Sequence, residues 1–276
     1  MKKIIRVFPR KTNLTPDDED VVINMGPSIL DYEVDEVHVS VLFKHDVSRG
    51  YELAEHWEKV AKVKIGGVGL DQRGEDFVPG FYVKRGAVIT SRGCNNRCWF
   101  CSVWKRDGRI RELPITEGYN VLDDNLFSCS ESHIRNVFEM LEKQKKKGHR
   151  IQFTGGIEAG LIADWHIDLL YRLKPKQMFF SYDQECDAEK VANAGEMLKK
   201  AGFRRNCMRC YVLIGYYGDT FNDAEHRLKQ SMRFGFMPMA MLYMDDSGRR
   251  DPEWRKFQRY WSRPAIMAKE FEKVKK

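Results

Sequence analysis

Apolar positions recur with the strand period in some segments of the chain and with the helix period in the segments between them, which predicts strands followed by helices. Between residues 86 and 246 lie six apolar segments of strand length, in order GAVIT, YNVLDD, RIQFTGG, QMFFSYD, CYVLIGY and MAMLYMDD. Amphipathic segments separate several of them, and the first of these runs from about Ser130 to Lys147 before Gly148. Strands and helices that alternate in this way form parallel sheets.

Two further helices have sequence signals at both ends. One begins after Asp187, a residue type that caps helices, and ends at Gly202, while the other follows Thr220 and ends at Gly235. No clear helix follows the first strand, between residues 102 and 114. Six such repeats predict an α/β fold, an incomplete (βα)6 TIM-like barrel, with ligands at the carboxyl ends of its strands.

The front of the chain predicts a smaller α/β unit. DEVHVSVLF has strand alternation, Leu53 and Trp57 follow at helical spacing, and the next apolar strand ends at Gly66. This strand, helix, strand order is Rossmann-like. We therefore expect three parts, which are the small unit over residues 1–86, the core over residues 87–248 and a basic tail over residues 249–276.

Positive charge is concentrated in that tail. The formal net charge is +7, and residues 249–276 hold ten basic and four acidic residues. A basic end attracts polyanions, although a solvated surface accounts for it as well. Trp254, Phe257 and Trp261 recur there at helical spacing, which fits either helix packing or stacking with single-stranded nucleic acid. Packing is the favoured interpretation.

Signals for export are lacking in the opening segment MKKIIRVFPR, whose apolar run before Arg6 has only two residues. No segment has the apolar length of a transmembrane helix. The odd number of cysteines, seven, favours thiols used as ligands over a disulfide framework. We expect a protein of the reducing cytoplasm that does not associate with membranes.

Three cysteines, Cys94, Cys98 and Cys101, lie in the loop that follows the strand AVIT. A structural zinc site uses four protein ligands, and zinc completed by a distant cysteine is one alternative. Three thiolates also suit a [4Fe-4S] cluster, because one of its irons then stays open to a small molecule. The histidines form no ligand pair, and Trp165 and His166 are expected at the surface.

The segment CNNRCWFC resembles the signature loop of the radical S-adenosylmethionine (SAM) enzymes. The resemblance covers residues 87 to about 244. It implies that SAM binds the open iron, is cleaved by an electron from the cluster, and yields a 5′-deoxyadenosyl radical that abstracts hydrogen. In the family, the residue at the position of Phe100 lies near the adenine. An external electron donor of flavodoxin or ferredoxin type is also implied.

The resemblance extends to the ends of later strands. Asp124 in NVLDDNLFS and Glu158 in QFTGGIEAG are both candidates for binding the SAM amine, and the sequence does not decide between them. QFTGGIEAG is similar to the family's Gly-Gly-Glu element, with an isoleucine inserted. In FFSYDQE, Ser181, Asp183 or Gln184 could reach the ribose, and Asp183 is the candidate chosen, with a turn or capping role as its alternative. Gly215 in YVLIGYYGDT is the candidate for the adenine.

The front unit is similar in shape to the cobalamin-binding domain that precedes some radical SAM barrels. VKIGGVGL matches that domain's closing strand and glycines, but the D-x-H-x-x-G loop that binds cobalt is absent. We expect a shortened unit without cobalamin. As a whole, the chain resembles short radical SAM proteins of phages and bacteria.

The leading interpretation is a radical SAM enzyme with a [4Fe-4S] cluster, SAM and an unidentified substrate, of which a nucleotide or nucleic acid is one class. No catalytic residue is assigned, although Tyr182, Tyr216 and Cys210 are candidates for the radical step. One alternative is a methylthiotransferase-like enzyme with a second cluster at Cys207 and Cys210, but burial of Cys210 is favoured. Another is a metal-stabilised, non-catalytic module that binds nucleic acid.

Overall fold

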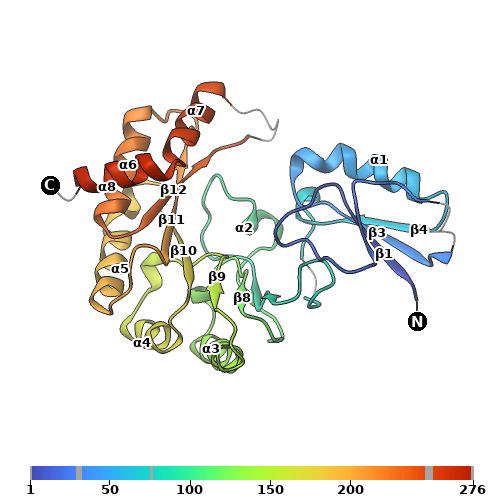
Figure 1. Cartoon of the computed structure of the whole chain (residues 1–276), viewed down its shortest axis with the longest axis horizontal. Helices are drawn as coiled ribbons and strands as arrows, with labels where there is room; N and C mark the ends of the chain where they lie inside the picture. Colours follow the sequence, from blue (N-terminus) through green and yellow to red (C-terminus); the bar gives the residue numbers. More distant parts are fainter. Residues whose placement is uncertain (1, 29–32, 75–76, 246–250, 275–276) are drawn as a thin grey trace. The chain divides into compact units, whose positions relative to one another are not determined.

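The computed structural model describes residues 2–28, 33–74, 77–245 and 251–274. The chain forms two compact units, residues 1–118 and residues 119–276 (Figure 1). The predicted division into three parts stays a prediction, and the boundary it places between residues 248 and 249 lies outside the described residues.

The first unit contains a parallel sheet with the strand order β2-β1-β3-β4. Its strands are β1 (Ile4–Phe8), β2 (Val21–Ile23), β3 (Glu36–Ser40) and β4 (Lys62–Gly66). Helix α1 (Val47–Trp57) connects β3 to β4 and buries Leu53 and Trp57 in the core of this unit. The predicted strand, helix, strand segment is present, and β1 and β2 are additional.

A short ladder follows in the same unit. Strands β6 (Ser91–Arg92) and β7 (Arg111–Glu112) pair antiparallel, and β5 (Ala87–Val88) precedes them. The connection between β6 and β7 contains only the one-turn helix α2 (Val103–Arg106), which agrees with the lack of a helical pattern there.

The second unit contains parallel strands in the order β12-β11-β10-β9-β8. They are β8 (Asn120–Val121), β9 (Gln152–Phe153), β10 (Gln177–Ser181), β11 (Met208–Ile214) and β12 (Met237–Leu242). The connecting helices are α3 (Glu131–Lys146), α4 (Asp164–Leu173), α5 (Ala188–Lys200) and α6 (Phe221–Arg233). In Figure 1 these four helices lie on one side of the strands. The structure is therefore a mixed α/β fold with parallel sheets.

The helix ends follow the sequence signals. Ser130 accepts a hydrogen bond from the backbone of His133 at the start of α3, and Thr220 accepts one from Asp223 at the start of α6. Asp187 precedes α5, although its side chain makes no capping hydrogen bond. Glycines with positive φ follow α3, α5 and α6, at Gly148, Gly202 and Gly235.

The tail forms two helices, α7 (Pro252–Trp261) and α8 (Pro264–Val274). Proline suits the first turn of a helix because its missing N–H has no partner there, so Pro264 begins a second helix. Trp254 lies 4.3 Å from Phe221 between ring centroids, and Trp261 is only 2% exposed. The packing interpretation of the tail aromatics is confirmed.

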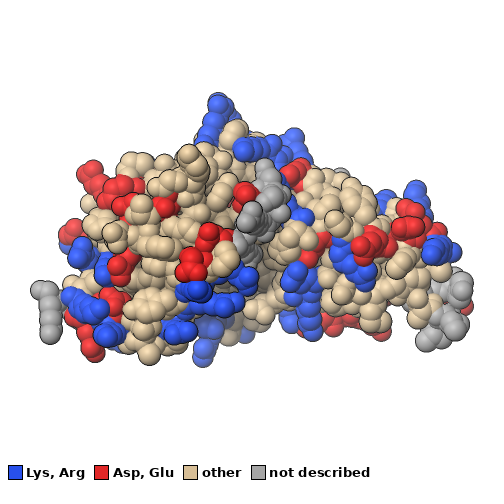
Figure 2. Space-filling model, turned by 90° about the horizontal axis from the view of Figure 1, so that it is seen from above, with Lys and Arg blue, Asp and Glu red and all other residues tan. Residues whose placement is uncertain are grey.

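The surface mixes both signs of charge. On the face drawn in Figure 2, Lys and Arg side chains are interspersed with Asp and Glu. Among the described residues, no helix combines the length and the apolar character that crossing a membrane requires.

Candidate functional site

The loop with Cys94, Cys98 and Cys101 begins after β6 and returns through α2 to β7. The antiparallel pairing of β6 with β7 therefore holds the two ends of the loop together. All three cysteines are half-buried. Gly93 has φ 87°, and a Cβ there would lie 2.4 Å from the carbonyl oxygen of Arg109. The loop therefore needs glycine where its two ends meet.

Hydrogen bonds define the turn around the cysteines. The carbonyl of Cys98 accepts from the Cys101 N–H at 3.1 Å and from Trp104 Nε1 at 2.9 Å. The N–H of Asn96 is directed at the sulfur of Cys94 over 3.4 Å. The thiolate form of cysteine is the form that binds a metal. The donor set and its turn therefore fit a thiolate-bound cluster.

Phe100 lies in the same turn. Its ring is half-buried and meets the edge of Trp99 with centroids 5.4 Å apart, while Trp99 is 47% exposed. Within the part of the chain that the structure describes, no three His, Cys, Asp or Glu side chains are grouped so as to hold a metal ion. In a [4Fe-4S] cluster each thiolate binds a different iron, so its ligands are spread around a cube rather than around one ion.

Asp124 and Glu158, the two candidates for the SAM amine, follow the neighbouring strands β8 and β9. A Cβ on Gly155 would lie 2.2 Å from the carbonyl oxygen of Asp123, and one on Gly156 would lie 2.6 Å from that of Asp124. Only glycines permit this approach. The backbone that leads to Glu158 therefore passes close to the end of β8.

Asn125 connects the two strand ends directly. It is 3% exposed, and its Nδ2 donates to Glu158 Oε2 at 2.6 Å. Asp124 and Glu158 are both half-buried. No role was predicted for Asn125, although an amide directly after two aspartates at a strand end was the available signal.

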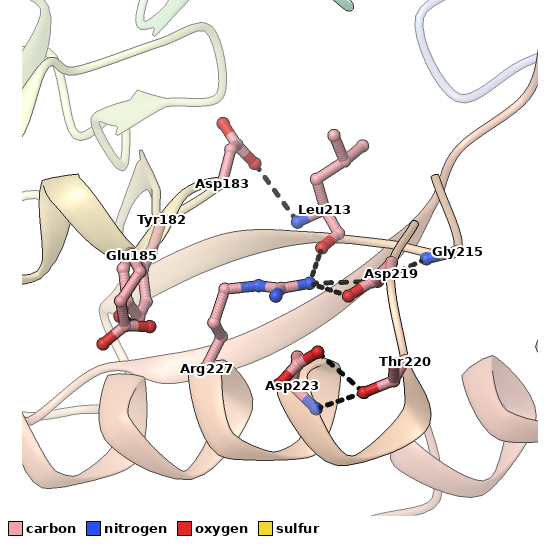
Figure 3. Close-up of polar contacts among 9 residues, drawn as sticks. All are labelled: Tyr182, Asp183, Glu185, Leu213, Gly215, Asp219, Thr220, Asp223 and Arg227. Atoms are coloured by element: carbon pink, nitrogen blue, oxygen red, sulfur yellow. Dashed lines mark hydrogen bonds and ion pairs between the residues drawn. The ribbon is translucent and has the colours of Figure 1, made fainter. Parts of the chain in front are cut away.

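Asp183 follows β10 and bonds across to β11. Its Oδ1 accepts the N–H of Leu213 at 3.1 Å, and Figure 3 shows its other oxygen directed away from that contact. Burial raises the pKa of Asp183 to about 6, although the Leu213 N–H opposes that rise. Carboxyls with perturbed pKa values cluster at functional sites, so Asp183 stays a candidate.

A buried ion pair shapes the loop after β11 (Figure 3). Arg227 of α6 donates to both carboxylate oxygens of Asp219, at 2.9 and 3.0 Å, and to the Leu213 carbonyl at 3.0 Å. Asp219 in turn accepts the N–H of Gly215 at 2.8 Å. No motif in the sequence signals this pair, because it joins a loop to a helix surface.

Gly215 has φ 72°, and a Cβ there would lie 2.9 Å from ring atoms of Trp254 and 2.8 Å from Leu242. An aromatic ring of α7 therefore lies against the glycine that the family resemblance assigns to the adenine. The roles of Gly215, Phe100, Asp124, Glu158 and Asp183 stay predictions.

Two candidates for the radical step are enclosed. Tyr182 and Cys210 are both 0% exposed, and burial raises the pKa of the Cys210 thiol to about 12. Tyr182 donates to Glu185 at 3.0 Å. The favoured burial of Cys210 is confirmed. Tyr216 is half-buried, with the Arg227 guanidinium 5.4 Å from its ring centroid.

The expectation that His166 lies at the surface is wrong. His166 is 4% exposed, stacks on Phe127 at 4.2 Å and accepts the N–H of Ala163 through Nδ1 at 3.1 Å. It shares one helix face with the buried Leu170 and Leu173, at spacings of four and seven residues. That periodicity was the signal missed. Burial lowers the pKa of His166 to about 4.

Comparison with known proteins identifies the fold. No protein-family model matches the chain, and no curated protein matches its sequence. The radical SAM methyltransferase TsrM from Kitasatospora setae, in a structure with cobalamin and a [4Fe-4S] cluster, matches with a TM-score of 0.62. That match has 12% sequence identity and covers 88% of this chain and 75% of TsrM. This chain shares the TsrM fold.

A second TsrM structure, with tryptophan substrate and the SAM analogue aza-SAM, gives a TM-score of 0.61. It also has 12% identity and covers 88% of this chain and 73% of that chain. Because each match covers 88% of this chain, it includes parts of both units. The suspected likeness to the radical SAM superfamily is therefore borne out at the level of the fold.

Proposed function

We propose that this protein is a radical SAM enzyme in which Cys94, Cys98 and Cys101 ligate a [4Fe-4S] cluster. The observation that carries the proposal is the three-thiol turn, after which the next cysteine in the sequence is Cys129, in a chain that shares its fold with TsrM. Three protein ligands leave one iron for SAM. We further propose that the strands of residues 87–248 form an incomplete (βα)6 barrel.

The chain's own residues bind and orient SAM in this proposal. Glu158 holds the amine, because Asn125 fixes one carboxylate oxygen and leaves the other for an ammonium group. Asp183 binds the ribose, and Phe100 and Gly215 lie at the adenine. When bound, the reduced cluster supplies the electron that splits SAM into methionine and a 5′-deoxyadenosyl radical.

The electron comes from a small protein of flavodoxin or ferredoxin type, and an oxygen-sensitive cluster suits a cytoplasmic location. Cobalamin is not part of the proposal, because the first unit lacks the D-x-H-x-x-G ligand loop. A second cluster is not proposed either, since Cys210 is fully buried on an apolar strand.

The test is anaerobic reconstitution followed by reduction with dithionite in the presence of SAM. We expect about four irons per chain and release of 5′-deoxyadenosine. Cys98→Ala should abolish that product, whereas Cys186→Ala, which alters an exposed cysteine outside the turn, should not. Equal product from the wild type and Cys98→Ala would show that the proposal is wrong, and seven or more irons would indicate a second cluster.

A further inference from the structure

Strands β10, β11 and β12 have one face toward the helices and one away from them. Phe180 and Cys210 are register partners on the helix side, since Phe180 contacts the buried Phe236, which packs on Gly195 of α5. Side chains alternate along a strand, so the neighbouring residues point to the opposite face. The pairs on that face are Phe179 with Arg209, Ser181 with Tyr211, Arg209 with Met237, and Tyr211 with Met239.

That opposite face is accessible. Ser181 is exposed although β10 is an interior strand, while its neighbours Phe180 and Tyr182 are 1% and 0% exposed. Tyr211 and Met239 are half-buried, and Met241 is 41% exposed. Solvent therefore reaches this face at the carboxyl end of β10 and beside Tyr211 and Met239.

Arg209 places a positive charge on this face. It is half-buried, its Nε is buried without a hydrogen-bond partner, and among the described residues no carboxylate forms an ion pair with it. A guanidinium presents five N–H donors, and leaving them partly desolvated without an acceptor is unfavourable. Carboxylate and phosphate groups match its geometry best.

Apolar and aromatic side chains lie beside that charge. Phe179 and Tyr211 stack with centroids 5.0 Å apart and an interplanar angle of 25°. On the adjacent edge strand, every second residue is a methionine, at Met237, Met239 and Met241. Methionine adapts to the shape of a ligand and makes favourable contacts with rings.

We propose that this face binds the substrate and that the substrate is a small organic anion. Its carboxylate or phosphate group bonds to Arg209, and its apolar body lies against Tyr211 and Met239. The inference rests on the proposed radical SAM function and names the substrate class of that enzyme.

The test uses the full reconstituted chain and three probes of similar size, namely 3-phenylpropionate, phenyl phosphate and the neutral 3-phenylpropanol. Saturation-transfer NMR titrations measure the dissociation constant of each. The wild type should bind at least one anionic probe more tightly than the alcohol, and which anion is preferred separates a carboxylate substrate from a phosphate substrate. Arg209→Gln should weaken the preferred anion by about tenfold to a hundredfold and leave the alcohol unchanged.

Three further variants make the result specific. Arg233→Gln, the same substitution at an exposed position of α6, should change no probe. Tyr211→Leu should weaken all three probes together, because it removes stacking rather than charge. Arg209→Lys should keep part of the anion preference, which provides a second measurement should Arg209→Gln fold poorly.

Equal affinity for the anions and the alcohol, equal behaviour of Arg209→Gln and Arg233→Gln, or no binding by any probe would each overturn the inference. Release of 5′-deoxyadenosine without added substrate is measured on the same preparations. If that product is absent from the wild type, the proposed function fails, whereas normal release with no anion preference means that only the substrate class is wrong.

Discussion

Asn125 donates its side-chain N–H to a carboxylate oxygen of Glu158 over 2.6 Å, and this bond joins the ends of β8 and β9. Asn125 is 3% exposed, so water competes little for the contact. The bond fixes the orientation of the Glu158 carboxylate. A fixed carboxylate at a strand end loses less conformational entropy when it binds an ammonium group than a mobile one does.

Glu158→Gln should therefore weaken SAM binding more than Asp124→Asn. Removing the charge from a hydrogen-bonded ammonium contact costs about tenfold or more in affinity. Asn125→Ala should have an intermediate effect, since it releases the carboxylate without removing it. Isothermal titration of SAM into the reconstituted variants measures these differences. A larger effect of Asp124→Asn would transfer the amine-binding role to Asp124.

The ion pair between Arg227 and Asp219 predicts an effect on stability. The side chains are 5% and 0% exposed, so Arg227→Met leaves a carboxylate buried without its counter-charge. The expected loss is about 3–5 kcal/mol in the free energy of unfolding. The matched control Arg233→Met, on the exposed surface of the same helix, should lie within about 0.5 kcal/mol of the wild type.

Urea denaturation measures both variants. The double variant Arg227→Met with Asp219→Asn should recover part of the lost stability, because no buried charge is then left unpaired. A double variant less stable than Arg227→Met alone would show that the pair acts through packing rather than charge.

Replacing Asp183 by Asn should raise the stability of the protein at high pH. Burial raises the pKa of Asp183 in the folded protein to about 6, whereas in the unfolded chain it ionises near its usual value of about 4. As pH rises from about 4 to about 6, the carboxyl of Asp183 loses its proton in the unfolded chain before it does in the folded protein. The folded state therefore loses stability over this range and does not regain it at higher pH. Asp183→Asn removes this penalty.

The melting temperature of Asp183→Asn should therefore exceed that of the wild type at pH 8 and match it near pH 4. Asp187→Asn is a suitable control, because Asp187 lies nearby on the same segment before α5. If Asp183→Asn shows no gain at pH 8, the carboxylate is better solvated than its contacts indicate.

Local sequence signals predicted the helices of the second unit well. Caps at Ser130 and Thr220 and glycines after the helices act within a few residues, so they can be recognised without tertiary structure. The cysteine turn was recognisable for the same reason. Strand β1 was missed because Arg6 interrupts its apolar pattern, yet Arg6 is buried and donates to the carbonyl of Phe81 at 2.8 Å.

Contacts between distant segments were not predictable in this way. The bond between Asn125 and Glu158 spans 33 residues, and the ion pair of Arg227 depends on how α6 packs against the loop after β11. Arg209 directly precedes the predicted strand CYVLIGY, and no role was predicted for it. Only the strand register places it beside Tyr211 and the β12 methionines.

The buried side chain of His166 should make the folded protein less stable at acid pH. Burial lowers the pKa of His166 to about 4 in the folded protein, against about 6.5 when unfolded. Between these values the unfolded chain binds a proton that the folded chain does not, so stability falls as pH decreases from about 6.5 to about 4 and the loss is complete below that.

His166→Phe keeps an aromatic ring against Phe127 but cannot be protonated. We expect it to be less stable than the wild type at pH 8, because the Ala163 N–H loses its acceptor, and to lose less stability between pH 6.5 and pH 4. Urea denaturation at several pH values measures the slope. His56→Phe, at an exposed position of α1, should keep the wild-type slope. An unchanged slope in His166→Phe would assign the acid sensitivity to other groups.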